Sequence, residues 1–159
     1  MPYRSVVVAS VLTALGLAAA PAVAQAPLTI TFKETNKGST FKFVDNPPRA
    51  TNPNRPQPSA GDNFVISTRL VSASGAGRGR LRATCTLTGS STKSTPAICY
   101  GVFALKEGQL AAIVSSANLD AKTTRGVIVG GTGPYAGARG TFTSVTTKTG
   151  ANDTVTLTG

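Results

Sequence analysis

Histidine and tryptophan are absent from this 159-residue sequence, and acidic residues are scarce. Without histidine, neither a Ser-His nor a Cys-His nucleophile system can be assembled. The two cysteines are too few to complete a tetrahedral metal site. The six acidic residues show no two members on an obvious strand face, which disfavours the carboxylate pair of a glycosidase. We therefore expect no hydrolytic chemistry, no metal and no cofactor.

The N-terminal segment has the pattern of a secretory signal peptide. Arg4 precedes an apolar run over residues 6–20, and Ala22-Val23-Ala24 forms a small-residue cleavage site. The run is shorter than the roughly 18 residues that span a membrane. We expect residues 1–24 to be removed, with no membrane anchor left, and residues 25–159 to form one secreted or periplasmic domain.

The formal net charge is +10, which raises the question of an anionic partner. The basic residues are scattered along the chain rather than clustered. A solvated basic surface is the favoured interpretation, and we expect no nucleic-acid partner. The alternative, binding of an anionic polymer, would show affinity that collapses with added salt.

Strand patterns dominate after the signal segment. Apolar residues alternate with polar ones from Leu28 to Phe32 and again from Phe41 to Phe43, a period of two that is typical of half-buried strands. Residues 45–60 contain several prolines and predict a long surface loop. This loop is either an ordinary flexible insertion or a lid.

Two longer runs, residues 62–73 and 78–88, flank a Ser-Gly-Ala-Gly loop. Treating that quartet as the hairpin loop pairs Arg69 with Arg82 and Leu70 with Leu81. One face is then apolar and the other is mixed and cationic, as in a barrel wall. Arg69 and Arg82 are candidates for an anion clamp, with a solvated outer wall as the alternative.

Cys85 and Cys99 flank the next hairpin. If they face each other, Leu87 pairs with Ala97 and Leu81 with Phe103, all on one face. Export to an oxidising compartment makes a bond between them the default expectation. The sequence therefore predicts a Cys85–Cys99 disulfide.

Residues 130–140 are rich in glycine and follow an apolar run. Gly131, Gly133 and Ala136 imitate the spacing of a dinucleotide-binding fingerprint, which requires a following helix. The β-branched run over residues 141–147 follows instead. We expect a structural corner between strands rather than a phosphate site.

The remaining runs complete an all-β pattern, with a turn expected over residues 150–153 and a last strand over residues 154–157. About eight closely spaced strands predict a small closed antiparallel β-barrel. A barrel of that size has room for one small ligand.

The glycine corner resembles the corresponding turn of dirigent proteins and of allene oxide cyclase-like barrels. The Gly61-Asp62 pair at the start of a strand and the run from Cys99 into residues 107–110 extend the similarity. The resemblance covers residues 60–159 and implies the barrel fold and a trimer. It also implies that a mostly apolar cavity restrains a reactive substrate during coupling or cyclisation.

A small apolar or aromatic molecule is thus the expected partner, held with isomerase- or cyclase-like steering. The expected ligand contacts are Asp62, from the resemblance, Arg69 and Arg82, and the hydroxyls of Tyr100 and Tyr135. Asp62 could instead bond the backbone of its own turn, and Tyr135 could close the corner. The alternative function is a non-catalytic carrier or a structural barrel with a sealed core.

Overall fold

The computed structural model describes residues 26–47, 58–89, 94–116 and 118–158. The expected signal peptide and the central part of the proline-rich loop lie outside these residues. Within the described ranges, no helix is long and apolar enough to cross a membrane.

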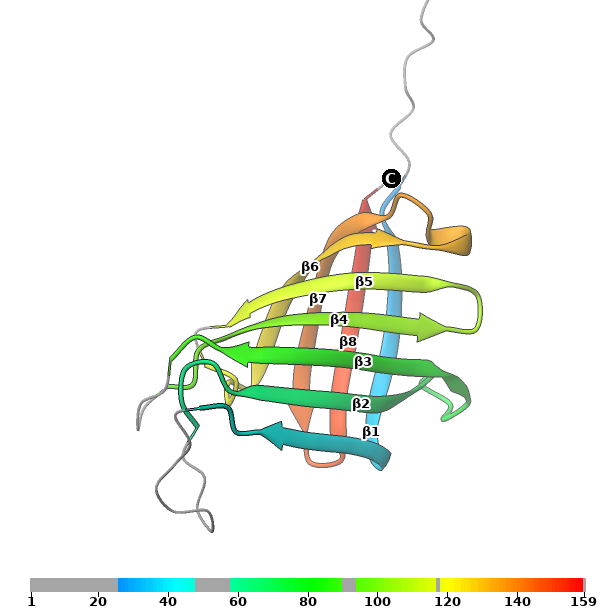
Figure 1. The fold of residues 1–159 in the computed structure, drawn as a ribbon. Helices are drawn as coiled ribbons and strands as arrows, with labels where there is room; N and C mark the ends of the chain where they lie inside the picture. The colour runs from blue at the N-terminus through cyan, green and yellow to red at the C-terminus, as the bar shows by residue number, and fades with distance from the viewer. Residues whose placement is uncertain (1–25, 48–57, 90–93, 117, 159) are drawn as a thin grey trace, which may run out of the picture.

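The chain forms a closed antiparallel barrel in which each strand pairs with its neighbours in sequence and the last pairs with the first (Figure 1). The predicted fold class is therefore confirmed. The strands are β1 (Leu28–Val44), β2 (Asn63–Val71), β3 (Gly77–Leu87), β4 (Ala97–Leu105), β5 (Gln109–Ser116), β6 (Thr123–Gly131), β7 (Arg139–Thr147) and β8 (Gly150–Thr158).

Strand β1 closes the barrel because it serves two partners in succession. Residues Leu28–Thr35 pair with β8, whereas Lys33–Thr35 and Thr40–Val44 pair with β2, so Lys33–Thr35 have a partner strand on each side. An irregularity between Thr35 and Thr40 separates the two parts and bends the strand (Figure 1). The two alternating segments expected from the sequence are thus one bent strand.

The predicted register of the β2–β3 hairpin is wrong by two residues. Arg69 lies opposite Arg80 rather than Arg82, and Leu70 lies opposite Gly79 rather than Leu81. The hairpin loop lies earlier than expected, because Val71 is already opposite Gly77, and a bulge between Leu70 and Val71 then shifts the register by one residue. Because side chains alternate with a period of two, a two-residue slip leaves each predicted face intact.

The expected turn over residues 150–153 is also wrong, since β8 already begins at Gly150. Gly150 has φ +149°, and a Cβ atom there would lie 2.0 Å from the backbone oxygen of Glu34. Glycine therefore lets β8 approach β1 closely at this point. As a result Asp153 lies within a strand rather than in a turn.

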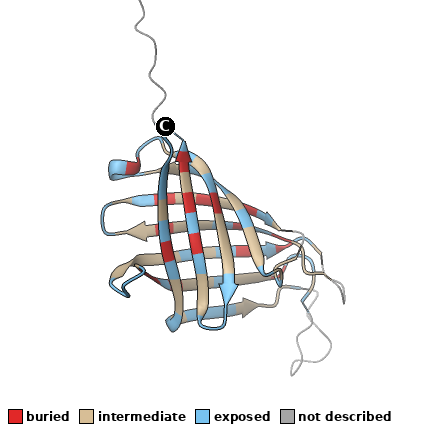
Figure 2. Cartoon of the chain, turned by 180° about the vertical axis from the view of Figure 1, so that it is seen from behind, coloured by how far each residue is buried: buried red, intermediate tan, exposed pale blue. Residues whose placement is uncertain are grey.

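Buried residues line the inward face of the barrel, as the band along the strands in Figure 2 shows. The glycine corner lies at one end, where a single 3-10 turn, η1 (Gly133–Tyr135), precedes β7. Gly133 has φ +61°, so a tight corner and not an α-helix follows β6. The fully buried apolar side chains come from β1 to β6 and β8: Phe32, Phe103, Leu70, Leu87, Leu110, Ile128 and Val155.

Candidate functional site

An internal cavity of about 210 Å³ lies within the barrel. It exists because three small residues, Ala83, Gly101 and Ala112, are directly opposite one another on β3, β4 and β5. Short side chains in one row leave space that larger neighbours cannot fill. The other lining residues are Glu34, Ile66, Leu81, Cys85, Cys99, Phe103, Val114, Leu119, Thr124, Phe142 and Ser144.

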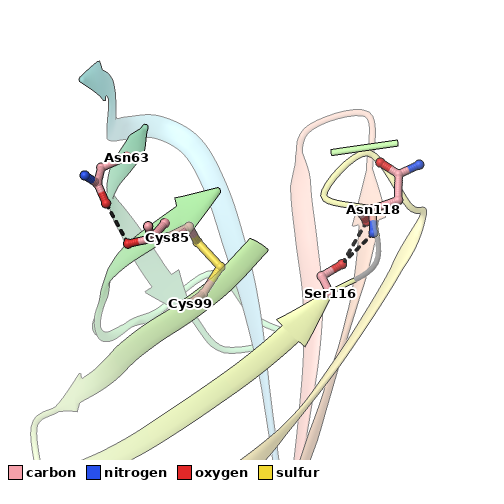
Figure 3. Close-up of a disulfide and its surroundings, with 6 residues drawn as sticks. Asn63, Cys85, Cys99, Ser116 and Asn118 are labelled. Carbon is pink, nitrogen blue, oxygen red and sulfur yellow. Dashed lines mark hydrogen bonds between the residues drawn. A yellow bond between two sulfur atoms is a disulfide. The ribbon is translucent and has the colours of Figure 1, made fainter. Parts of the chain in front are cut away.

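Aromatic rings and a disulfide form much of the cavity wall. Phe103 meets Phe142 edge to face at 5.7 Å between ring centroids and stacks on Phe32 at 5.9 Å. The predicted bond between Cys85 and Cys99 is present, with the Cα atoms 3.9 Å apart (Figure 3). The disulfide thus braces the β3–β4 hairpin from within.

Glu34 and Asp153 bring two carboxyl groups together where the barrel closes. Asp153 on β8 lies opposite Phe32, and Glu34 is two residues further along β1 on the same face. Glu34 lines the cavity, and Asp153 is only 1% exposed. This pair was not predicted from the sequence. Continuing the period-two pattern beyond Phe32 would have placed Glu34 inside.

Burial and the Asp153 charge together raise the pKa of Glu34 from 4.5 to about 8. The Thr68 hydroxyl acts in the opposite direction. Burial also raises the pKa of Asp153, against hydrogen bonding from Ser144 and Glu34. Because both pKa values are raised and the two carboxyl groups act on each other, the pair titrates as a unit and holds a proton more tightly than isolated carboxyl groups do.

The carboxylate oxygens of Asp153 are both buried and, among the described residues, have no hydrogen-bond partner of normal geometry. Ser144, directly opposite on β7, and Glu34 are the side chains close enough to affect its pKa. Unpaired buried acceptors are rare in folded proteins and commonly occur at functional sites. Asp153 is not among the residues that line the cavity, so this unused hydrogen-bonding capacity lies next to the lining residues Glu34 and Ser144.

Asp62 is completely buried but lies apart from the cavity. Its Oδ1 accepts a hydrogen bond from the backbone N–H of Asn46 at 2.8 Å, and its Oδ2 accepts one from the N–H of Ser59 at 2.7 Å. Burial acts to raise the pKa of Asp62, but these bonds outweigh it and hold the pKa below its ordinary value of 3.8. Asp62 thus ties together the two flanks of the proline-rich loop.

Arg69, Arg82 and Tyr100 are exposed on the outer wall of the barrel. Arg82 and Tyr100 line an open outer groove of about 460 Å³ that runs across β2 to β6. Arg69 is not among the residues that line this groove, and its partner across the hairpin is Arg80. Arg69 and Arg82 are therefore diagonal rather than directly opposed on the outer face, and the expected clamp stays a prediction.

Tyr135 is buried within the glycine corner. A Cβ atom on Gly108, in the turn between β4 and β5, would lie 3.2 Å from the Tyr135 ring. The ring therefore covers that turn. None of the five expected ligand contacts lines the internal cavity formed by the described residues, and their binding roles stay predictions.

Comparisons with solved structures find the same barrel in proteins of low sequence identity. Pyocyanin demethylase shares 22% identity, with a TM-score of 0.68 over 82% of this chain and 99% of that chain. An exo-specific intermolecular Diels-Alderase, AbnU, shares 15% identity, with a TM-score of 0.55 over 85% of this chain and 100% of that one.

A pterocarpan synthase dirigent protein shares 15% identity, with a TM-score of 0.57 over 92% of this chain and 97% of that chain. No family model and no curated protein matches the sequence. The three solved structures share the barrel and are described by different activities, so the likeness identifies a fold and not a reaction. This chain has the dirigent-like β-barrel fold.

Proposed function

We propose that the protein binds a small apolar or aromatic molecule inside the barrel and that Glu34 donates a hydrogen bond or a proton to it. The observation that carries this proposal is the position of the Glu34 carboxyl group in the wall of a mostly apolar cavity, where burial and Asp153 raise its pKa to about 8. A neutral carboxylic acid is a donor that polarises a carbonyl oxygen or a ring nitrogen.

The cavity has room for one or two rings of a ligand. An apolar cavity of about 150 Å³ in another protein accommodates benzene, and the barrel cavity measures about 210 Å³. Its wall is mainly aliphatic and aromatic, with Glu34, Thr124 and Ser144 as the polar exceptions. Ligand sites typically combine such an apolar lining with a few convergent polar groups.

The chemistry available is acid–base catalysis combined with steering. Glu34 gives a proton to the ligand in its acid form and takes one back in its carboxylate form, while the neighbouring Asp153, which is not among the lining residues, raises the pKa of Glu34. A closely fitting cavity lowers a barrier by orientation, which alone contributes several kcal/mol. Such a site suits an isomerase- or cyclase-like step on a molecule that is already reactive.

A sealed structural barrel is less well supported, because the interior holds an unfilled cavity and a carboxyl pair.

A non-catalytic carrier can be distinguished from an enzyme by measuring proton exchange on a bound ketone. In deuterium oxide, acid–base catalysis would accelerate exchange of the methyl protons of 2-acetylnaphthalene, and Glu34→Gln would slow that exchange. A carrier would leave the exchange at its rate in free solution.

The location of the ligand can be tested with 2-acetylnaphthalene as a fluorescent probe. Ala112→Phe places a ring in the cavity, whereas Ala111→Phe places the same ring on the outer groove. We expect Ala112→Phe to weaken binding at least tenfold and Ala111→Phe to leave it unchanged. The reverse result would place the ligand in the outer groove. Ala112→Leu, which fills less space, serves if Ala112→Phe fails to fold.

We also propose export to an extracytoplasmic compartment and self-association, as the signal-peptide pattern and the dirigent resemblance imply. The outer wall exposes large apolar side chains, including those of Val65, Tyr100 and Val127, which supports burial against further copies. Light scattering of the mature protein should give the mass of a trimer. A monomeric mass at micromolar concentration would contradict the proposal of self-association.

A further inference from the structure

The two rows of side chains that line the cavity continue beyond it into aromatic residues. One row runs across β3, β4 and β5 from Cys85 through Cys99 to Val114, and Phe64 and Phe43 extend it across β2 and β1. The other, which includes Ala83 and Gly101, extends through Ile66 to Phe41. Directly opposed residues project to the same face of a sheet. Phe41, Phe43 and Phe64 therefore belong to the same inner wall as the cavity.

The barrel is open at these aromatic residues. Strand β8 pairs with β1 from Leu28 to Thr35, and the later part of β1 extends past that pairing along β2 (Figure 1). Phe41 is accordingly 64% exposed, although it faces inward by register. Its ring lies 5.0 Å from that of Phe64, which lies 5.1 Å from that of Phe43.

Distance along β2 relates this aromatic group to Glu34. Leu70 is the residue opposite Glu34 and Ile66 is the residue opposite Phe41. They are four residues apart on one strand, which corresponds to roughly 13 Å. A single ring held at Glu34 cannot reach Phe41, whereas a flat molecule of several fused rings can contact both.

We propose that Phe41, Phe43 and Phe64 form a stacking platform at the mouth, so that the ligand is an elongated, planar aromatic molecule of more than two fused rings. A hydrogen-bond acceptor at its inner end meets Glu34, and its outer end lies on the platform. Stacking of the ligand's aromatic rings on these phenylalanine side chains favours such a ligand over an aliphatic one of equal size. This inference rests on the proposed function and adds the class of ligand.

The test compares two ketones that differ by one fused ring, 2-acetylnaphthalene and 2-acetylanthracene, by fluorescence titration at neutral pH. We expect Phe41→Ala to weaken binding of the larger probe about five- to tenfold and that of the smaller less than about twofold. Phe41→Leu, which keeps apolar bulk without a ring, should behave like Phe41→Ala. Lys42→Ala, an exposed change between Phe41 and Phe43 on β1, is the matched control and should alter neither affinity.

The outcomes separate the two proposals. If Ala112→Phe abolishes binding of both probes but Phe41→Ala affects both equally or neither, the platform is wrong and the internal site stands. If Phe41→Ala changes the mass measured by light scattering but no probe affinity, the aromatic group is a contact between copies, and the platform is again wrong. If neither probe binds the wild-type protein, both proposals fail.

Discussion

A carboxyl group next to aromatic rings loses hydration that water would give its ionised form, so its proton is held more tightly. Glu34 is in this position, and the neighbouring Asp153 adds like-charge repulsion. Asp62 shows the opposite balance, because backbone donors from Asn46 and Ser59 stabilise its ionised form. A carboxyl group therefore serves as a candidate functional group at Glu34 and as a structural hydrogen-bond acceptor at Asp62.

These shifts predict how stability depends on pH. A pKa of Glu34 raised from 4.5 to about 8 means that the folded state holds an extra proton between those values. The contribution of the Glu34 proton to the free energy of unfolding is therefore fully present below about pH 4.5. This contribution, a few kcal/mol, is lost as the pH rises through about 8. The lowered pKa of Asp62 acts oppositely, since its contribution is lost as pH falls below about 4.

Glu34→Gln should accordingly flatten the fall in stability between about pH 5 and pH 8 and make the variant more stable than wild type at pH 8. Urea unfolding at a series of pH values measures this directly. Glu107→Gln, whose side chain is 43% exposed, is the matched control and should follow the wild-type curve. A parallel pH profile for Glu34→Gln and wild type would show that Glu34 ionises normally.

Among the elements, the glycine corner between β6 and β7 depends on backbone conformation. Gly133 has φ +61°, and a Cβ atom there would lie 2.8 Å from the backbone oxygen of Glu107. Gly133→Val should cost about 1–3 kcal/mol of unfolding free energy, measured by urea titration. Gly137→Val, where φ is +77° but nothing lies within 4 Å of the Cβ atom, reports the backbone cost alone and should be milder.

The same variant tests whether the corner is structural. Neither wild type nor Gly133→Val should bind NAD or ATP, since the short turn η1 gives way to β7 rather than to a helix. Saturable micromolar binding of either nucleotide, lost in a still-folded Gly133→Val protein, would contradict this.

The β3–β4 hairpin carries the disulfide, whose cysteines are 14 residues apart. Closing a loop of that length stabilises the folded state by about 3 kcal/mol. Reduction should lower the unfolding free energy by that amount, whereas a Cys85→Ser/Cys99→Ser variant should not respond to reductant. Alkylation of two thiols in unreduced, native protein would contradict the pairing.

Pattern reasoning succeeded where local rules decide the outcome. Strand faces follow from alternation, and the Cys85–Cys99 hairpin has the predicted register, with Leu87 opposite Ala97. It failed where a single residue changes the strand register or the position of a turn. The different position of the hairpin loop, with Val71 already opposite Gly77, and a one-residue bulge beside Leu70 together moved the β2–β3 register by two. Gly150 extended β8 into an expected turn.

The candidate site was largely beyond local reasoning, because it forms only when the barrel closes. Glu34 and Asp153 lie on the first and last strands, and their proximity depends on the β1–β8 pairing. The alternation of apolar residues along each strand nevertheless indicated that each of these two residues faces inward. Glu34 continues the inward series of Ile30 and Phe32, and Asp153 precedes Val155 and Leu157 on the same face.

For the whole molecule, the barrel begins after the segment that we predict to be removed. Strand β1 begins at Leu28, shortly after the predicted cleavage point. Intact-mass measurement of exported protein should therefore give a chain that begins at Gln25. A replacement of Ala24 by Arg should block cleavage, and a retained apolar segment in wild-type protein would contradict the signal-peptide prediction.

Pairing of Leu28 with Leu157 has a kinetic consequence. The outermost strands meet across nearly the full sequence, so the entropy of closing that loop must be overcome before their contacts contribute. A ribosome-bound chain lacking β8 cannot complete the cylinder, and β1 and β7 would remain as unpaired edges prone to aggregation. Folding should therefore be slow, on the order of milliseconds to seconds, and should finish only after synthesis of the last strand.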